Sequence, residues 1–140
     1  MSTFDGLYNI RNGTKDDFKF IMATFLRGLY YGESWFSTMP KAVFMDNYKH
    51  VAERIVTSPN TAVTIACLPD DPTVVLGYSI LSSDYQDVHW VYVKKIWRNR
   101  GIARTLLPKH PAKVTHLTDL GKKLLTKLNN PVFDPFMKEL

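Results

Sequence analysis

The sequence predicts an α/β (α+β) fold in which a mixed, mostly antiparallel central sheet is flanked by helices. Three observations support this class. The chain has 140 residues, which suits one core, so residues 1–140 are expected to form one domain. Hydrophobic periodicity is helical in the first third and strand-like in the middle. The expected elements follow the order β-α-α-β-β-β-α-β-α-β, without a repeat, a linker or a low-complexity segment.

The N-terminal third predicts a strand and two helices. Residues 7–14 alternate and end in a turn signal, which favours a short strand. Thr14 is the expected N-cap of the first helix, and Gly32 is its expected stop. Its apolar residues recur at helical spacing: Phe18, Ile21, Phe25 and Leu29. After a loop at 29–40, residues 40–59 predict a second helix. Its expected apolar stripe is Val43, Tyr48, Val51 and Ile55.

The remaining residues predict a hairpin and then alternating elements. Residues 61–68 and 73–83 are rich in strand-forming residues and flank a proline-bearing turn, which predicts the hairpin. The later elements are expected to be a strand at 88–94, a helix at 101–107, a strand at 112–118, a helix at 119–130 and a strand at 131–137. Pro108 and Pro111 end the 101–107 helix early.

Composition excludes several classes of protein. Hydrophobic residues make up 45% of the chain, which argues against disorder. No apolar run approaches the roughly 20 residues of a membrane-spanning helix, so no membrane partner is expected. The N-terminus has no secretory pattern, and the single cysteine, Cys67, is expected in the core. These features predict a cytoplasmic protein. No Cys and His spacing suggests a metal site.

Positive charge is concentrated in one segment. From Lys94 to Lys127 there are ten Lys or Arg residues and one acid, Asp119, a net charge of +9. The remaining eight basic and twelve acidic residues give −4, for a total of +5. Such a segment usually meets phosphates, in a nucleotide cofactor or a nucleic acid.

The turn before residues 101–107 has the features of a phosphate site. A helix start presents unpaired N–H groups and a partial positive charge, and small residues let a pyrophosphate approach. Gly101 and Ala103 are the small residues, and Arg98, Arg100 and Arg104 surround them. The turn matches neither the P-loop pattern nor the GxGxxG pattern.

The segment Arg98-Asn99-Arg100-Gly101-Ile102-Ala103 follows a predicted strand and fits the pattern Arg/Gln-x-x-Gly-x-Gly/Ala. In this motif and in its order of elements, the chain resembles the GCN5-related N-acetyltransferases (GNAT), as a short, phage-type member. The motif covers only residues 91–107. The resemblance implies acetyl-CoA as acyl donor and an amine acceptor, which attacks the acyl group directly.

The resemblance also implies roles for single residues. Residues of the turn would hold the CoA pyrophosphate: Arg98, Asn99, Arg100, Gly101, Ile102, Ala103 and Arg104. The strand edge at Val91, Tyr92 and Val93 would bind the pantetheine arm. This strand would diverge from the strand that begins near Lys113, and so open the donor site.

The general acid and base stay open. Many GNAT members carry a tyrosine in the last helix that protonates the CoA thiolate, and residues 119–130 contain none. His89 and Tyr92 are the candidate catalytic residues. Regular alternation would place them on opposite faces of the strand, unless a β-bulge intervenes. Ordinary packing is an alternative explanation for each of these two residues. Asp87 and Glu33 are further candidates for the base, and Thr118, Asp119 or solvent for the acid.

Acceptor specificity in this family usually comes from the loop between the first two helices, here 29–40. Tyr31, Glu33 and Trp35 are the expected acceptor contacts. The acceptor is a small-molecule or protein amine. Aromatic rings beside a basic surface also suit a nucleobase, so an enzyme that modifies DNA or RNA, like phage Mom-type modifiers in fold class, is an alternative. A non-catalytic CoA-binding module is another. Monomer and homodimer both remain open.

Overall fold

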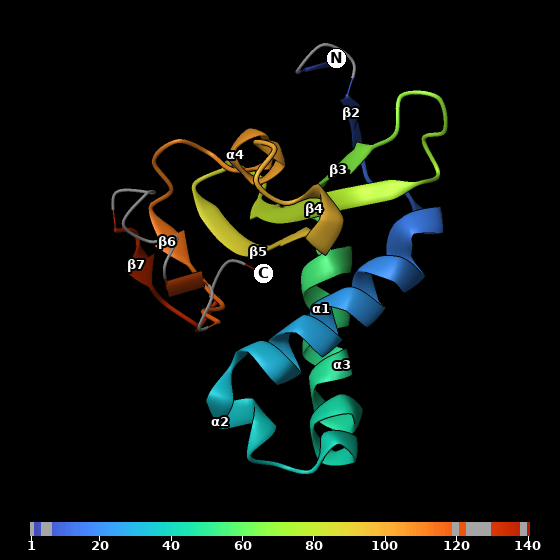
Figure 1. Ribbon diagram of the computed structural model, residues 1–140. Helices are drawn as coiled ribbons and strands as arrows, with labels where there is room; N and C mark the ends of the chain where they lie inside the picture. Colours follow the sequence, from blue (N-terminus) through green and yellow to red (C-terminus); the bar gives the residue numbers. More distant parts are fainter. Residues whose placement is uncertain (1, 4–6, 119–120, 123–129, 138–139) are drawn as a thin grey trace.

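A computed structural model of the chain describes residues 2–3, 7–118, 121–122, 130–137 and 140. Seven strands form one sheet in chain order (Figure 1). They are β1 (Ser2–Thr3), β2 (Tyr8–Asn12), β3 (Thr61–Cys67), β4 (Val75–Ser82), β5 (Asp87–Val93), β6 (Lys113–Val114) and β7 (Val132–Phe133). Neighbours from β1 to β5 pair antiparallel, whereas β6 pairs parallel with both β5 and β7. The predicted mixed, mostly antiparallel sheet is confirmed.

Helices cover both faces of the sheet. They are α1 (Phe18–Gly32), α2 (Ser34–Ser37), α3 (Lys41–Thr57) and α4 (Ile102–Leu106), with two 3-10 turns, η2 (Lys15–Asp17) and η3 (Lys95–Trp97). The long helices α1 and α3 pack together below the sheet in Figure 1, and α4 lies above it. The predicted 29–40 loop is partly helical, because α1 continues to Gly32 and α2 follows directly.

The two faces have separate cores. On the face of α1 and α3, Phe25, Tyr78 and Trp90 belong to one cluster of buried side chains. On the opposite face, α4 contributes Ile102 and Leu106 to a second cluster, which the sheet completes. The central strands β3, β4 and β5 supply both clusters, as expected for strands covered on two sides. Cys67 is buried in the first core, as predicted.

The predicted stripe of α3 is wrong at its first position. Val43 is 49% exposed, whereas its neighbour Phe44 is 1% exposed. Phe44 stacks on Tyr48 and contacts the rings of Tyr30 and Phe36. The pattern of residues 44, 48, 52 and 55 fits one helix face better than a stripe that begins at residue 43. The aromatic residues that precede α3 therefore select the face that is buried.

The start of α1 is fixed by an ion pair. The Thr14 N–H donates to the Asp17 carboxylate at 2.8 Å, and the Asp17 N–H donates to the Thr14 carbonyl at 3.0 Å. Arg11 on β2 donates two further hydrogen bonds to Asp17, both at 2.8 Å. Thr14 is the N-cap of the 3-10 turn that leads into α1, whereas the N-cap of α1 itself is Asp17, three residues later than predicted.

The C-terminal strands are shorter than predicted. Of residues 112–118 only Lys113 and Val114 form a strand, and β7 is two residues long. The helix predicted at 119–130 lies mostly outside the described residues, where Gly121 and Lys122 are helical. Within the described parts of the chain, no helix has the length and apolar character needed to cross a bilayer.

Candidate active site

Strands β5 and β6 pair over only two residues and then separate. Their register joins Asp87 to Lys113 and Val88 to Val114, and the Thr115 N–H donates to the Val88 carbonyl at 3.0 Å. Strand β5 then continues to Val93, and no later residue of β6 pairs with it in the described chain. The geometry is the splayed strand pair that the resemblance implied. Beyond Val88, one edge of β5 therefore has no strand partner among the described residues.

The backbone of Val91 and Val93 points to that edge. The Lys94 N–H donates to the Leu76 carbonyl of β4 at 2.8 Å, which fixes the alternation of hydrogen bonds along β5. Tyr92 therefore exchanges hydrogen bonds with β4, and its two neighbours direct their N–H and C=O groups away from β4. Arg98 donates from Nε to the Val93 carbonyl at 3.1 Å. The edge thus leads directly to the basic turn.

The turn from Arg98 to Gly101 has a left-handed backbone at two positions. Asn99 has a φ of 65° and Gly101 a φ of 82°. Gly101 is the N-cap of α4, whose first residue, Ile102, is buried in the core. The Thr105 hydroxyl donates to the Gly101 carbonyl at 3.0 Å and also bonds the Tyr8 hydroxyl at 2.8 Å. The turn is therefore anchored to β2.

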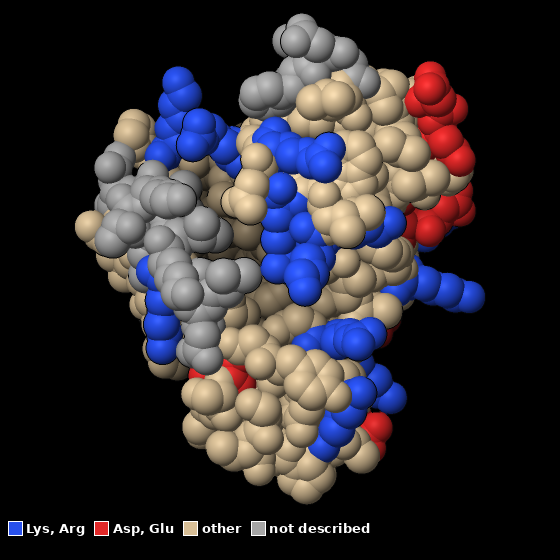
Figure 2. Space-filling model, viewed as in Figure 1, with Lys and Arg blue, Asp and Glu red and all other residues tan. Residues whose placement is uncertain are grey.

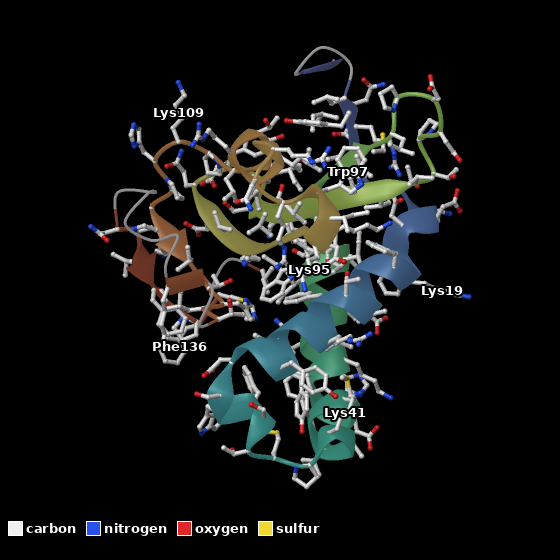
Figure 3. All side chains as sticks on the ribbon, in the orientation of Figure 1. Lys19, Lys41, Lys95, Trp97, Lys109 and Phe136 are labelled. Atoms are coloured by element: carbon white, nitrogen blue, oxygen red, sulfur yellow. The ribbon has the colours of Figure 1, made fainter. Side chains whose placement is uncertain are left out.

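The charged side chains of the turn are exposed. Arg98, Asn99, Arg100 and Arg104 all face solvent, while Ala103 is half-buried. The Arg100 guanidinium lies over the Trp97 ring, 4.9 Å from its centroid. In Figures 2 and 3, basic side chains occupy the centre of the face that carries Lys95 and Trp97, and acidic side chains gather at the β3–β4 loop. The sequence-predicted residues of the donor site therefore lie together.

His89 occupies a β-bulge of β5. Trp90 opposes Ile80, but Leu81 opposes Val88, so His89 is an additional residue without its own partner on β4. As a result Val88 packs with Leu81 and Val114, whereas Trp90 packs on the α1 face. Regular alternation would place Val88 and Trp90 on one face, and the bulge separates them. The side chain of His89 is 5% exposed.

A chain of hydrogen bonds leads from His89 to α3. His89 Nδ1 bonds the Thr115 hydroxyl at 2.9 Å, and the same hydroxyl bonds His116 Nδ1 at 2.9 Å. His116 Nε2 bonds the Tyr48 hydroxyl. Burial lowers the pKa of His116 to about 3, and the neighbouring His89 acts in the same direction. Burial also raises the pKa of Tyr48 to about 12. Both groups are therefore neutral near pH 7.

Sequence reasoning missed this chain. The sequence pattern predicts Thr115 and His116 as strand residues and Tyr48 only as part of an apolar stripe. Tyr48 and His116 are 68 residues apart, so no local spacing connects them. The available signal in the sequence is a Thr-His pair immediately after the residues that form β6.

Tyr92, the other candidate catalytic residue, lies in a different setting. Its ring packs against Phe20 and Tyr78, with centroids 6.0 and 5.5 Å away. No hydrogen bond within the described residues joins it to His89. The structure therefore does not combine the two candidates in one hydrogen-bonded group.

The predicted acceptor residues lie at the opposite end of the helical pair from α4 (Figure 1). Tyr31 and Trp35 are 60% and 66% exposed. Glu33 accepts a hydrogen bond from the Trp35 N–H at 3.1 Å and caps α2. Lys41 lies over the Tyr31 ring at 5.3 Å. This region is connected to the hydrogen-bonded chain at His89 only indirectly, because the ring of Phe36 in α2 contacts the ring of Tyr48.

The fold is shared with solved acetyltransferase structures. A protein from Pyrococcus furiosus, provisionally described as an acetyl transferase, aligns with a TM-score of 0.55 and 17% identity over 71% of this chain and 68% of its own. A "possible acetyltransferase" from Clostridium difficile 630 aligns with a TM-score of 0.50 and 20% identity over 71% of this chain. The chain spans 66% of the length of that second protein. No model of a protein family and no curated protein matches the sequence.

These alignments define the class of fold: a mixed sheet with helices on both faces, as in acetyltransferases. Among the described residues, no three His, Cys, Asp or Glu side chains gather as the ligands of a metal ion would.

Proposed function

We propose that the chain is an acyl-CoA-dependent N-acyltransferase that transfers an acetyl group to an amine by direct attack. The observation that carries this proposal is the separation of β5 from β6 beside the turn at Gly101. An extended backbone edge that ends at a basic turn with left-handed residues suits a ligand with an amide-bearing arm and a diphosphate. Acetyl-CoA has both parts. The shared acetyltransferase fold supports the same choice of donor.

The donor would bind mainly to the backbone. Val91 and Val93 would hydrogen-bond the amides of the pantetheine arm, as one strand does with another, while Tyr92 holds β5 on β4. N–H groups of residues 98–103 would receive the pyrophosphate, because a left-handed turn directs successive N–H groups to one side. Arg98, Arg100 and Arg104 would supply the exposed charge around it.

Catalysis would consist largely of positioning and of stabilising charge. A backbone N–H of the β5 edge would donate to the acyl oxygen as it becomes an oxyanion. The amine must reach the carbonyl carbon without its extra proton, and the CoA sulfur leaves as a thiolate that needs one. His89 is the candidate for proton transfer, since it lies at the bulge where β5 and β6 separate. Tyr92 is the second candidate, closer to the basic turn.

The acceptor would enter from the side of α1 and α3. Tyr31 and Trp35 offer exposed rings for an apolar or planar group, and Glu33 offers a carboxylate for a cationic amine. A small amine or a protein amine both fit these residues.

The test is binding followed by turnover. We expect acetyl-CoA at millimolar concentration to raise the melting temperature, since a ligand that binds only the native state stabilises it. ATP at equal concentration tests whether any polyphosphate suffices. Release of CoA across a panel of amines then tests catalysis. No stabilisation by acetyl-CoA would contradict the donor assignment, and binding without CoA release would favour the non-catalytic module.

Amide hydrogen exchange tests the proposed strand edge directly. We expect the amides of Val91 and Val93 to exchange faster than those of Trp90 and Tyr92, which pair with β4. Acetyl-CoA should slow exchange at Val91 and Val93 and leave their neighbours nearly unchanged. Equal protection of all four amides before and after addition would argue against pantetheine pairing at β5.

A further inference from the structure

Lys94 follows directly after β5, and its side chain lies on the α1 face of the sheet. The Lys94 N–H donates to the Leu76 carbonyl at 2.8 Å, so this residue continues the pairing of β5 with β4. The Lys94 ammonium lies over the Phe20 ring of α1, 5.5 Å from its centroid. The same ring packs against Tyr92, with the two centroids 6.0 Å apart. The Lys94 amine and the Tyr92 ring therefore contact the same side chain of α1.

The surroundings of Lys94 differ from those of the other described lysines. Lys94 is half-buried, and in the described chain this is otherwise true only of Lys113, whose Nζ lies 3.8 Å from the Asp134 carboxylate. No ion pair joins Lys94 to a carboxylate of the described residues. Acetylation removes the charge of a lysine. At Lys113 it would leave Asp134 without its partner, whereas at Lys94 it leaves no described acid unpaired.

The proposed donor-binding edge of β5 lies beside this amine. Val93 is the immediate neighbour of Lys94, and Val91 lies three residues, or about 10 Å, further back along the strand. Tyr92 lies between these two valines, and its ring shares Phe20 with the Lys94 amine. A lysine carries its amine on a flexible four-carbon stem. This stem allows the amine to leave the Phe20 ring for an acyl group that is held at the edge of β5.

We propose that Lys94 is a modification site, at which the chain transfers the acetyl group of its own bound acetyl-CoA to the Lys94 amine. This proposal rests on the proposed function for the acyl donor, and it names an acceptor amine within the chain itself. The product, acetyl-lysine, is uncharged, and its apolar stem would keep its contact with the Phe20 ring.

The reaction balances between the lysine and the acyl donor. The Lys94 ammonium first releases one proton to solvent, which its half-buried position allows. The neutral nitrogen then forms a bond to the acetyl carbon, and the carbon–sulfur bond breaks. A second proton leaves the nitrogen as the amide forms, and the CoA thiolate takes up a proton. The products are acetylated Lys94, free CoA and one released proton, so no other reactant is needed.

Lys41 provides a matched control within the same chain. Its ammonium also lies over an aromatic ring, that of Tyr31, at 5.3 Å from the centroid. Lys41 begins α3, at the end of the helical pair that is far from the sheet (Figure 3). It is exposed, as is Lys95, which directly follows Lys94. If exposure or an aromatic neighbour alone decided the reaction, Lys41 or Lys95 would react at least as fast as Lys94.

Peptide mass spectrometry of the whole protein, incubated with acetyl-CoA, measures the acetylation rate of each lysine. We expect Lys94 to react at least about 10-fold faster than Lys41, because a donor bound beside the amine replaces a chance encounter in solution. N-hydroxysuccinimidyl acetate needs no binding site, so it should modify the exposed Lys41 faster than the half-buried Lys94. If the ratio of the Lys94 rate to the Lys41 rate is the same with both reagents, the proposal is overturned.

Two variants test whether the transfer occurs within one chain. Gly101→Val keeps Lys94 and should lose the donor site, whereas Lys94→Arg keeps the donor site and a positive charge over Phe20 but has no lysine amine there. We expect no acetylation of Lys94 above that of Lys41 in the Gly101→Val protein, either alone or mixed with the Lys94→Arg protein. Faster acetylation of Lys94 in that mixture would show transfer between two molecules and overturn the proposal.

Binding of acetyl-CoA separates a failure of this site from a failure of the proposed function. If acetyl-CoA does not raise the melting temperature of the wild-type protein, the donor assignment is wrong, and Lys94 should then react no faster than Lys41. If acetyl-CoA raises the melting temperature and CoA is released with added amines, while Lys94 reacts no faster than Lys41, the assignment of Lys94 alone is wrong.

Discussion

Gly101 is the residue at which the proposed donor site can be tested most sharply. Its φ of 82° is strained for residues with a Cβ, and a side chain would also enter the space proposed for the diphosphate. We expect Gly101→Val to abolish the thermal shift caused by acetyl-CoA. The melting temperature of the ligand-free protein should also fall, because a β-branched residue costs about 1 to 2 kcal/mol at this φ, so the shift caused by acetyl-CoA is measured against the variant's own ligand-free value.

Asn99 supplies the matched control for Gly101. It also has a positive φ, of 65°, and its side chain is exposed. Asn99→Gly removes the side chain and keeps the backbone conformation, so acetyl-CoA binding should persist. Loss of binding in Asn99→Gly, with binding retained in Gly101→Val, would show that side chains and not the backbone hold the ligand.

The ion pair of Asp17 predicts how the free energy of unfolding depends on pH. The hydrogen bonds from Arg11 hold the pKa of Asp17 below its ordinary value of 3.8. A lowered folded-state pKa stabilises the protein above the unfolded pKa, and this contribution disappears as the pH falls through the folded value. We expect Asp17→Asn to lower the free energy of unfolding by about 1 to 3 kcal/mol at pH 7.

The acid range provides the control for Asp17. As the pH falls from 3.8 through the lower folded-state pKa of Asp17, wild type and Asp17→Asn should converge in urea denaturation, because the wild-type carboxylate takes up a proton and loses its charge. A difference between the two proteins that stays constant from pH 7 to pH 2.5 would assign the effect to the shape of the side chain and not to its charge.

At the scale of elements, α3 tests which face of a helix is buried. Phe44 contacts three aromatic rings in the core, and its neighbour Val43 is exposed. We expect Phe44→Ala to lower the free energy of unfolding by about 3 to 5 kcal/mol. Val43→Ala should change it by about 0.5 kcal/mol or less. Denaturant titration measures the free energy of unfolding of both variants. Equal losses in the two would support the buried stripe predicted from the sequence, which includes Val43.

Elements that depend on local pattern were predictable, and those that depend on distant partners were not. The strands β2 to β5 and the helices α1, α3 and α4 follow from alternation, helical spacing, proline and glycine. The early end of β6 depends on its separation from β5. Likewise, Phe44 and not Val43 is buried because rings from α1 and α2 pack against it. The sequence of α3 alone does not include those rings, so it could not predict this choice.

The candidate site divides in the same way. The turn at Gly101 was predictable because backbone geometry, charge and a preceding strand are adjacent in sequence. The surroundings of His89 were not, since the bulge arises from register with β4 and its hydrogen-bonded chain ends on α3. The turn at Gly101 is therefore encoded by neighbouring residues in the sequence. The surroundings of His89 form only when three segments that are distant in the sequence come together.

At the scale of the whole molecule, the two faces of the sheet carry different parts of the proposed reaction. The α4 face has the basic turn, and the α1–α3 face has the aromatic residues and the chain that ends at His89. Strand β6 pairs with β5 only at Asp87 and Val88, and the proposed reaction places the meeting of donor and acceptor beyond that point. A donor bound from one face would thus meet an acceptor that arrives from the other.

The exposed charge of the molecule allows the cofactor and nucleic acid to be distinguished. Arg98, Arg100 and Arg104 lie at the turn, whereas Lys15, Lys19 and Arg27 are exposed in η2 and α1, where Lys19 projects away from α4 (Figure 3). Changing either set to glutamine removes three positive charges. We expect only the changes in the first set to lower the affinity for acetyl-CoA, by about 10-fold, since exposed ion pairs contribute about 0.2 to 1 kcal/mol each.

Salt titration completes this comparison. A ligand gripped mainly by backbone N–H groups should lose little affinity between 50 and 200 mM salt, on the order of a few-fold, whereas nucleic acid held by six or more phosphate contacts loses about 1,000-fold or more. If both sets of glutamine variants bound a nucleic acid more weakly by the same factor, and if this binding depended steeply on salt, the whole basic surface would be the binding site. If the glutamine variants of Arg98, Arg100 and Arg104 weakened only the binding of acetyl-CoA, and the other set had no effect, the positive charge of residues 94–104 would contribute to binding of the acyl donor.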